Sequence, residues 1–309
     1  MNRQKIIISS GDPAGCGPFI AIKAIQAQKN KKNIFYLVGD KAVFERFSGY
    51  KKIKNDIEFI DLGIDGIEKI KKGQLSESAG RASLRYLDMS LKVMKKEKIQ
   101  RLVTAPLSKE AVKLSCKEFS GHTEYLAQYF KVKRIAMMMV SGRLKVALLT
   151  RHIPLRDVPK ALSEKLLLDC LSLVHEGLQY TFKINAPKIV VASLNPHAGV
   201  TTFIDSEEKV IKSAIAKFKN PVYGPYPCDT LFTKEVLEKY DCIICAYHDQ
   251  AMIPFKLLSF RLGVNLTLGL PIIRTSPAHG VAFDLIRKGK APFFSSMVEA
   301  VKLASKLNP

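Results

Sequence analysis

Three of the six histidines in this 309-residue sequence each stand just after a short apolar run. The runs and their histidines are residues 146–150 with His152, residues 188–193 with His197, and residues 242–246 with His248. If the runs are strands of one sheet, their carboxyl ends share an edge where the imidazoles can converge. Three neutral imidazoles suit a divalent metal and leave coordination positions open for catalysis. Spacing alone leaves an alternative open, in which three separate histidines are hydrogen-bonded at loop starts.

Polar residues accompany these histidines. Asp249 and Gln250 follow His248, and Asp229 lies in a proline-rich turn at residues 224–230. Such carboxylates could orient an imidazole or move a proton. The alternative for each is an aspartate that caps a turn.

Cationic and amide side chains form a second group of candidates. His122 and Thr123 enter a predicted helix, where Thr123 could cap the helix and free N–H groups could bind an anion. Lys256, Asn265 and Arg274 lie beside apolar stretches, where they could bind phosphate or carboxylate. The alternatives are a simple capped turn and ordinary surface charges.

The glycine-rich turn at residues 11–18 follows a predicted strand and precedes a predicted helix. Ile20 stands where a dinucleotide-binding G-x-G-x-x-G motif has its third glycine, and a P-loop lysine is missing. The turn alone is therefore a weak indication of a nucleotide site.

The elements that must position these residues alternate along the chain. We expect strands at residues 5–9, 34–38, 101–104, 146–150, 188–193 and 242–246. We expect helices at residues 18–28, 79–95, 124–130, 163–178, 206–216 and 233–240. Continuous apolar runs alternating with amphipathic stretches predict an α/β fold with a mostly parallel sheet. We further expect two lobes, interleaved in sequence, with a cleft between them.

The amino-acid composition limits the classes of protein to which this chain could belong. Apolar residues make up 47% of the chain and charged residues 25%, which is typical of a globular protein. No apolar run approaches the length of a membrane span, and the amino end lacks the pattern of a signal peptide. Six scattered cysteines favour reduced thiols in the cytoplasm. Cys242 and Cys245 form a C-x-x-C, which we interpret as core residues on a buried strand.

A net charge of +21 favours one alternative class, a basic nucleic-acid-binding protein. Against it, the basic residues form many short clusters on expected helix faces and turns, without interleaved aromatic residues. We therefore expect no nucleic-acid partner, although a positive field would help to capture an anionic substrate.

Taken together, the motifs resemble the 4-hydroxythreonine-4-phosphate dehydrogenase family of pyridoxal phosphate biosynthesis. The resemblance runs through nearly the whole chain. Its main carriers are Gly11-Asp-Pro-Ala-Gly15, Gly121-His-Thr-Glu124, Thr150-Arg-His-Ile-Pro-Leu155, Leu194-Asn-Pro-His-Ala-Gly199, Asp229-Thr-Leu-Phe232, Tyr247-His-Asp-Gln250 and Ile273-Arg-Thr-Ser276.

The resemblance implies a role for each candidate residue. Metal ligands are implied at His152, His197 and His248, and substrate contacts at His122, Thr123, Lys256, Asn265 and Arg274. The implied NAD (or NADP) contacts are His279, Gly280 and Asp284, and the implied proton-transfer residues are Lys256 and Asp229.

The resemblance also implies an architecture. The fold would be similar to that of isocitrate and isopropylmalate dehydrogenases, with one lobe at residues 1–115 plus 266–309. The second lobe, at residues 116–265, would carry most metal and substrate residues. A homodimer would complete each active site across its interface.

The implied reaction is the NAD-dependent oxidation and decarboxylation of 4-phosphohydroxy-L-threonine to 3-amino-2-oxopropyl phosphate, CO2 and NADH. One divalent metal (Zn, Co or Mg) would polarise the substrate oxygen. Departures from the family pattern at Phe19, Val200 and Ala278 bear on loop shape, cofactor geometry and substrate choice. A related dehydrogenase acting on another hydroxy or dihydrodiol carboxylate, and a metal-dependent hydrolase, therefore stay as alternatives.

Overall fold

The computed structural model describes residues 3–28, 33–199 and 206–309, which fold into two compact units. The first unit is discontinuous and comprises Met1–Lys131, Leu270–Leu307 and Pro309, whereas the second comprises Val132–Gly269 and Asn308. The first unit thus reaches beyond residue 115, where we had expected the boundary. The reason is that Leu126 of helix α5 (His122–Tyr129) is fully buried in the core of this unit.

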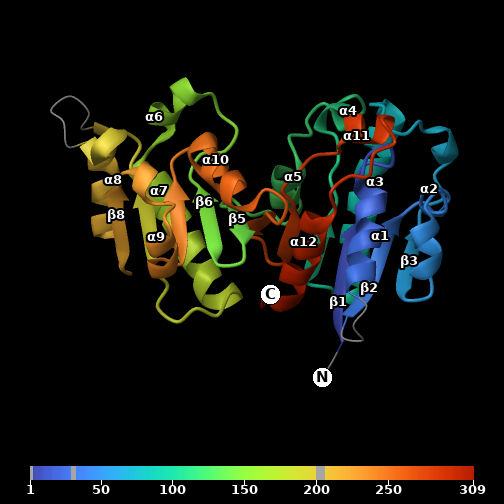
Figure 1. Cartoon of the computed structure of the whole chain (residues 1–309), viewed down its shortest axis with the longest axis horizontal. Coiled ribbons are helices and arrows are strands. Elements are labelled where there is room, and N and C mark those ends of the chain that lie inside the picture. Colours follow the sequence, from blue (N-terminus) through green and yellow to red (C-terminus); the bar gives the residue numbers. More distant parts are fainter. Residues whose placement is uncertain (1–2, 29–32, 200–205) are drawn as a thin grey trace. The chain divides into compact units, whose positions relative to one another are not determined.

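The first unit is built on a five-stranded parallel sheet (Figure 1). Its strands, in spatial order, are β3 (Ile57–Asp61), β2 (Asn33–Gly39), β1 (Gln4–Ser9), β4 (Arg101–Thr104) and β11 (Ile273–Pro277). Both faces of β1 are buried, because Ile6, Ile7 and Ile8 alternate between them and are all fully covered. The middle of this sheet is therefore closed to solvent, and polar chemistry is confined to its edges.

Helices cover the two faces of this sheet. Helix α12 (Ser295–Lys306) packs on β11, β4 and β1 beside helix α1 (Gly17–Ala27). Ile7 lies in a core with residues of helix α3 (Glu77–Glu97), whose first turn is capped by Ser76 Oγ accepting from Ala79 N. The remaining helices of the unit are α2 (Lys41–Phe44), α4 (Lys109–Lys113) and α11 (Phe283–Arg287).

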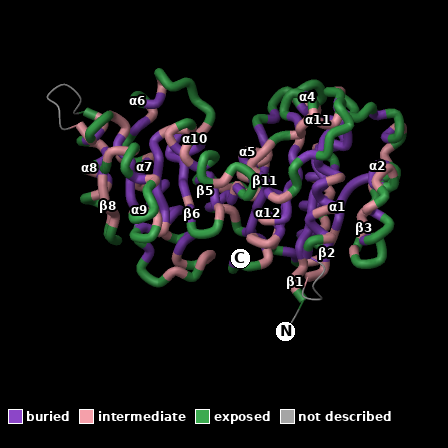
Figure 2. The backbone as a smooth tube through the Cα atoms, in the orientation of Figure 1, coloured by how far each residue is buried: buried purple, intermediate pink, exposed green. Residues whose placement is uncertain are grey.

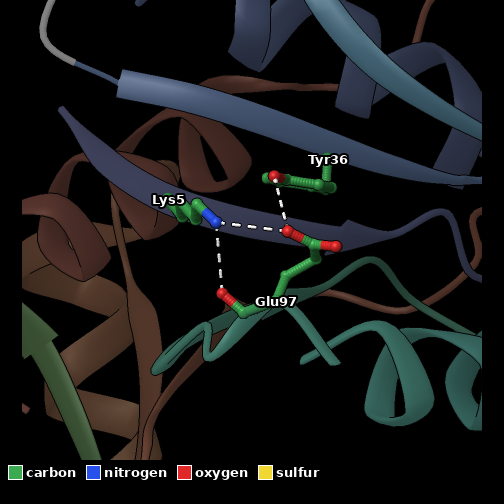
Figure 3. A network of polar contacts seen from close by, with 3 residues as sticks. All are labelled: Lys5, Tyr36 and Glu97. Atoms are coloured by element: carbon green, nitrogen blue, oxygen red, sulfur yellow. Dashed lines mark hydrogen bonds and ion pairs between the residues drawn. The ribbon is translucent and has the colours of Figure 1, made fainter. Parts of the chain in front are cut away.

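A polar network ties the start of the sheet to the end of α3 (Figure 3). Lys5 Nζ donates to Oε2 and to the backbone carbonyl of Glu97, each at 3.2 Å. Tyr36 Oη donates to the same Oε2 at 3.5 Å. The network lies near the amino ends of β1 and β2, so it anchors the sheet at the edge opposite the carboxyl ends.

The second unit has a six-stranded mixed sheet. Its strands, in spatial order, are β10 (Val264–Leu268), β5 (Ala136–Ser141), β6 (Leu144–Leu148), β9 (Cys242–Cys245), β7 (Ile189–Ala192) and β8 (Val222–Tyr226). Strands β6, β9, β7 and β8 run parallel, whereas β5 is antiparallel to both β10 and β6. The helices of this unit are α6 (Val158–Ala161), α7 (Glu164–Glu176), α8 (Ser206–Lys217), α9 (Lys234–Lys239) and α10 (His248–Ser259).

These observations confirm the predicted α/β class with mostly parallel strands. The strands form the buried interior of each unit, as the purple segments of Figure 2 show. Cys242 and Cys245 are buried on β9, which confirms that this C-x-x-C belongs to the core. Across the described residues, no helix has both the length and the apolar character that crossing a membrane requires.

Candidate active site

The three histidines follow three neighbouring parallel strands of the second unit. β9 lies between β6 and β7 and pairs in parallel with both. His152 follows β6, His248 follows β9, and His197 follows β7. The expectation that these strands end at a common edge is therefore correct.

Two of the three imidazoles lie close together. The ring centroids of His152 and His248 are 6.0 Å apart. His248 Nδ1 is 2.7 Å from Asp249 Oδ1, a contact that orients the ring and leaves Nε2 to face a ligand. Two such imidazoles, one of them backed by a carboxylate, are donors that a divalent transition metal accepts.

Gln250 fixes the start of α10 to the edge of the sheet. Its Oε1 accepts from Ala246 N at 2.7 Å, and its Nε2 donates to the Ser193 carbonyl at 2.7 Å. One side chain thus joins the residues that follow β9 and β7. These two hydrogen bonds position the first turn of α10 and therefore His248, which lies two residues before Gln250.

His197 lies in the short helix η5 (Pro196–Gly199) and is exposed. Its φ of 55° is a left-handed conformation that non-glycine residues seldom adopt. Within residues 3–28, 33–199 and 206–309, no three His, Cys, Asp or Glu side chains are grouped closely enough to hold a metal ion. The three-histidine ligand set therefore stays a prediction, and the departure at Val200 lies outside the described residues.

The other predicted residues of the second unit lie on three different elements. Lys256 is exposed on α10 rather than at a strand end. Asp229 is exposed in the short helix η6 (Cys228–Thr230), which follows β8. Asn265 is partly buried on β10.

The first unit gathers positive charge near the end of β4. Arg274 on β11 is almost fully buried, and its Nη2 donates to Thr104 Oγ1 at 2.8 Å. Burial lowers the pKa of Arg274 to about 10, and the Glu124 carboxylate partly opposes this shift. Arg274 is thus a buried cation and not the surface charge of the alternative interpretation.

His122 lies beside this cation. Burial holds the pKa of His122 well below its ordinary value, and the charges of Arg274 and Lys109 lower it further. The imidazole is therefore neutral at physiological pH and can donate or accept a hydrogen bond. The positive charges of Arg274 and Lys109, together with the neutral His122 imidazole, form an arrangement that suits an anionic group.

Thr123 does not cap helix α5. The N-cap residue is Gly121, and it makes no side-chain capping bond. A glycine is favoured there because its φ of 147° is a backbone conformation that other residues rarely adopt. Thr123 lies buried in the first turn instead, so the expectation of a threonine cap is wrong.

The segment predicted to bind NAD is joined to the turn between β1 and α1. Cys16 N donates to the Val281 carbonyl at 2.9 Å, and Cys16 Sγ lies 3.5 Å from the Gly280 carbonyl. His279 is partly buried, whereas Asp284 is exposed on α11 and pairs with Arg287. Two loops that sequence analysis treated separately are therefore one structure.

One of the three family departures, Phe19, has a structural explanation. Phe19 packs against Phe47 and Phe294, with ring centroids 6.1 and 6.5 Å apart, so an aromatic cluster occupies the place of an acidic residue. Ala278 N donates to Ser296 Oγ at 2.9 Å. This backbone contact does not depend on the side chain at position 278.

Sequence reasoning missed two residues of the first unit. Lys109 begins helix α4 and acts electrostatically on His122. Asp12 is fully buried in the glycine-rich turn, and burial raises its pKa to about 6, although N–H groups of Ala14, Ser108 and Gly15 oppose this. The rule that ligands collect at the carboxyl ends of strands could have identified both, because they follow β4 and β1.

Comparison with known proteins places this chain in a family. A family model for the pyridoxal phosphate biosynthetic protein PdxA matches residues 16–304. A 4-hydroxythreonine-4-phosphate dehydrogenase from Desulforapulum autotrophicum is 38% identical over 98% of this chain and 95% of its own length. The crystal structure of a 4-hydroxythreonine-4-phosphate dehydrogenase from Klebsiella pneumoniae is similar with a TM-score of 0.84, at 30% identity over 98% of this chain and 99% of that one. A terephthalate 1,2-cis-dihydrodiol dehydrogenase from Burkholderia xenovorans shares the fold, with a TM-score of 0.67 and 23% identity over 99% of this chain and 98% of that one.

The fold and the comparisons define a two-unit α/β oxidoreductase. The chain belongs to the PdxA family of pyridoxal phosphate biosynthetic proteins. This confirms the resemblance found in the motifs.

Proposed function

We propose that the chain catalyses the NAD-dependent oxidation and decarboxylation of 4-phosphohydroxy-L-threonine to 3-amino-2-oxopropyl phosphate, with one divalent metal. The names of its relatives support the substrate. The observation that carries the chemistry is the pairing of His152 with His248 at the carboxyl edge of three parallel strands.

The metal would be held by His152 and His248, with His197 as the third ligand. A divalent cation supplies Lewis acidity, which favours loss of the alcohol proton and stabilises negative charge on the substrate oxygen during decarboxylation. Asp249 fixes the His248 tautomer by accepting from Nδ1. Gln250 links the segment that leads to His248 with the segment that leads to His197.

The first unit would bind the anionic groups of the substrate. Arg274 and Lys109 supply positive charge, and neutral His122 supplies a hydrogen bond near the start of α5. Burial makes the Arg274 charge effective because little water screens it. Thr123 in the same helical turn would add a polar contact.

The nicotinamide cofactor would bind where the segment at residues 278–284 meets the glycine-rich turn. The hydrogen bond from Cys16 N to the Val281 carbonyl fixes this junction, which includes His279 and Gly280. Proton transfer would fall to Asp229 or Lys256, both of which are exposed and able to exchange protons with solvent.

We further propose a homodimer that buries the outer face of α10. Ile253, Leu257 and Phe260 are 60%, 83% and 68% exposed on this helix and just after it. Such a group of exposed large apolar side chains is typical of a protein interface. Lys256 lies on the same helix, so dimerisation would bring it to the partner subunit.

The metal assignment is tested with His152→Ala and His248→Ala, each purified, stripped with chelator and reloaded with a divalent metal. Bound metal and substrate-dependent NADH formation should both fall by more than about tenfold in each variant, because one ligand is lost. His175→Ala is the matched control, since His175 packs against Phe218 on another part of the second unit. Full metal content and activity in both site variants would refute the assignment.

The dimer is tested with Leu257→Asp, which places a charge on the proposed interface. Sedimentation should show a dimer for the unaltered chain and a monomer for the variant. A monomer in both cases would contradict the interface.

A further inference from the structure

A buried carboxyl group holds the segment that leads from β7 to His197. Glu208, in the first turn of α8, is fully buried. Its Oε1 accepts from Asn195 N at 2.8 Å, and its Oε2 accepts from Asn195 Nδ2 at 2.9 Å. One side chain therefore fixes both the main chain and the side chain of the residue two positions before His197.

Glu208 occupies a position on α8 where packing favours an apolar residue. Ile211 and Ala214 follow it at intervals of three and are buried as well, on a helix that packs against α7 and β8. Burying a carboxyl group is unfavourable unless it is hydrogen-bonded. The general preference of helix starts for acidic residues is met by Glu207, which is partly exposed. The two bonds to Asn195 therefore explain why this buried position carries a carboxyl group.

Further hydrogen bonds connect this contact to the other two strand ends that precede histidines. Ser193 Oγ donates to the Asn195 carbonyl at 2.8 Å. Gln250 joins the Ser193 carbonyl to Ala246 N, and Thr150 Oγ1 donates to the Ala246 carbonyl at 2.6 Å. A continuous series of hydrogen-bonded residues thus runs from the end of β6 past β9 and β7, and α8 provides its last member.

The short segment after Asn195 has an unfavourable backbone. His197 and Ala198 have φ values of 55° and 54°, which non-glycine residues seldom adopt. Such conformations persist where the surrounding structure holds them, and they are frequent at functional sites. The His197 side chain is itself exposed, so the support on its amino-terminal side comes through Asn195.

We propose that Glu208 is a positioning residue for His197. By fixing Asn195, its carboxyl group keeps the His197 imidazole toward the sheet edge that carries the other two histidines. This inference rests on the proposed function, in which His197 is the third metal ligand. Glu208 touches neither metal nor substrate in this role, so its loss should weaken metal binding without removing a ligand.

Glu208→Gln tests this role with little change of size. The amide keeps one acceptor, but its NH2 group would face a donor of Asn195, so one of the two hydrogen bonds is lost. Asn195→Asp in the same chain supplies an acceptor opposite that NH2 group and restores the pair with donor and acceptor exchanged. Glu235→Gln is the matched control, because it makes the same change of charge at an exposed position of the second unit.

Two measurements on the full chain do not require turnover. Hydrogen exchange of peptides that cover residues 193–199 should be faster in Glu208→Gln, because the segment loses a hydrogen bond that holds it. The Kd for Co²⁺, measured by calorimetric titration, should rise about tenfold. The double variant should recover most of both changes, and Glu235→Gln should match the unaltered chain.

Turnover and stability are measured on the same samples. At saturating Co²⁺, kcat should fall several-fold in Glu208→Gln whereas KM should change little, because Arg274 and His122 belong to the first unit. Urea unfolding separates this effect from a general loss of stability. Glu208→Asp, which keeps both acceptors on a shorter side chain, is a second variant and should show the same changes to a smaller degree.

Unchanged Co²⁺ affinity in Glu208→Gln, or a loss of affinity that the double variant does not recover, would overturn the proposal. An unaltered chain that binds Co²⁺ but never forms NADH would instead refute the proposed function, since hydrogen exchange and Co²⁺ affinity are measured without activity.

Discussion

Arg274 is a charged residue in a position that would normally hold an apolar one. The guanidinium is only 2% exposed, and burial lowers its pKa to about 10. Keeping a buried cation is costly unless it is paired or hydrogen-bonded. Arg274 donates a hydrogen bond to Thr104 and lowers the pKa of His122. We therefore interpret the buried charge as part of an anion-binding site.

We expect Arg274→Ala to raise the KM for the phosphorylated substrate by about tenfold to a hundredfold. A hydrogen bond to a charged group contributes about 1.5 to 3 kcal/mol, and each 1.4 kcal/mol is a factor of ten. The pKa of His122, followed by NMR, should rise in the same variant because a neighbouring positive charge is lost. An unchanged KM would remove Arg274 from the substrate site, and Arg274→Lys should give partial rescue.

The raised pKa of the buried Asp12 carboxyl leads us to predict a specific pH dependence of stability. Burial raises its pKa from 3.8 to about 6, so the folded state binds this proton more tightly than the unfolded chain does. The resulting stabilisation is present below about pH 4 and is lost as pH rises to about 6. A shift of about two units corresponds to about 3 kcal/mol.

Asp12→Asn should remove this dependence. The difference in the free energy of unfolding between the unaltered chain and the variant should therefore change by up to about 3 kcal/mol between pH 4 and pH 6.5. Urea unfolding at the two pH values measures it, with Asp65→Asn as an exposed control in the same unit. An equal difference at both pH values would contradict the prediction.

At the scale of elements, the strands that sequence analysis identified are largely buried, but the buried strands β5 and β10 were not identified. β1, β2, β4, β6, β7 and β9 read as continuous apolar runs and lie within one to two residues of their predicted bounds. β11 was missed because Arg274, Thr275 and Ser276 are polar, although all three are buried. Their burial depends on the neighbouring elements, which a local pattern does not contain.

Helix α10 was missed for a different reason. It contains Pro254, which predicts a break, and yet the helix continues from His248 to Ser259. The strand-end rule still located His248, because it depends on where β9 ends and not on the type of element after the strand. The site was therefore predictable as a group of strand ends, whereas the Thr123 conformation and the buried state of Arg274 required tertiary structure.

The contact between α3 and α4 gives a test at this scale. A Cβ added at Gly80 would lie 2.1 Å from the Ala111 carbonyl oxygen and 2.5 Å from Val112 N, both of which are backbone atoms that cannot rotate away. Alanine gains about 1 kcal/mol in helix propensity, but overpacking costs about 1 to 3 kcal/mol or more. Because this overlap is severe, we expect a net loss of stability for Gly80→Ala.

Urea unfolding of Gly80→Ala measures the sign of this effect. The variant should be less stable by at least about 1 kcal/mol, and it should also lose activity because α4 begins with Lys109. Arg85→Ala, an exposed change on the same helix, should leave stability nearly unchanged. A more stable Gly80→Ala variant would show that the two helices can separate at little cost.

At the scale of the whole molecule, the net charge of +21 suits the anionic ligands of the proposed function. The proposed substrate and the proposed nicotinamide cofactor both carry negative charge, and a positive protein would raise their encounter rate. The family model matches residues 16–304 and thus covers most of both units.

The central claim is that this chain is a metal-dependent dehydrogenase that also decarboxylates its product. The most direct measurement follows NADH and CO2 after the protein is mixed with 4-phosphohydroxy-L-threonine, NAD and a divalent metal. We predict NADH and CO2 in equal amounts, with both lost on chelation and restored when the metal is returned. Formation of neither product at any divalent metal tried, from a folded protein, would contradict the account.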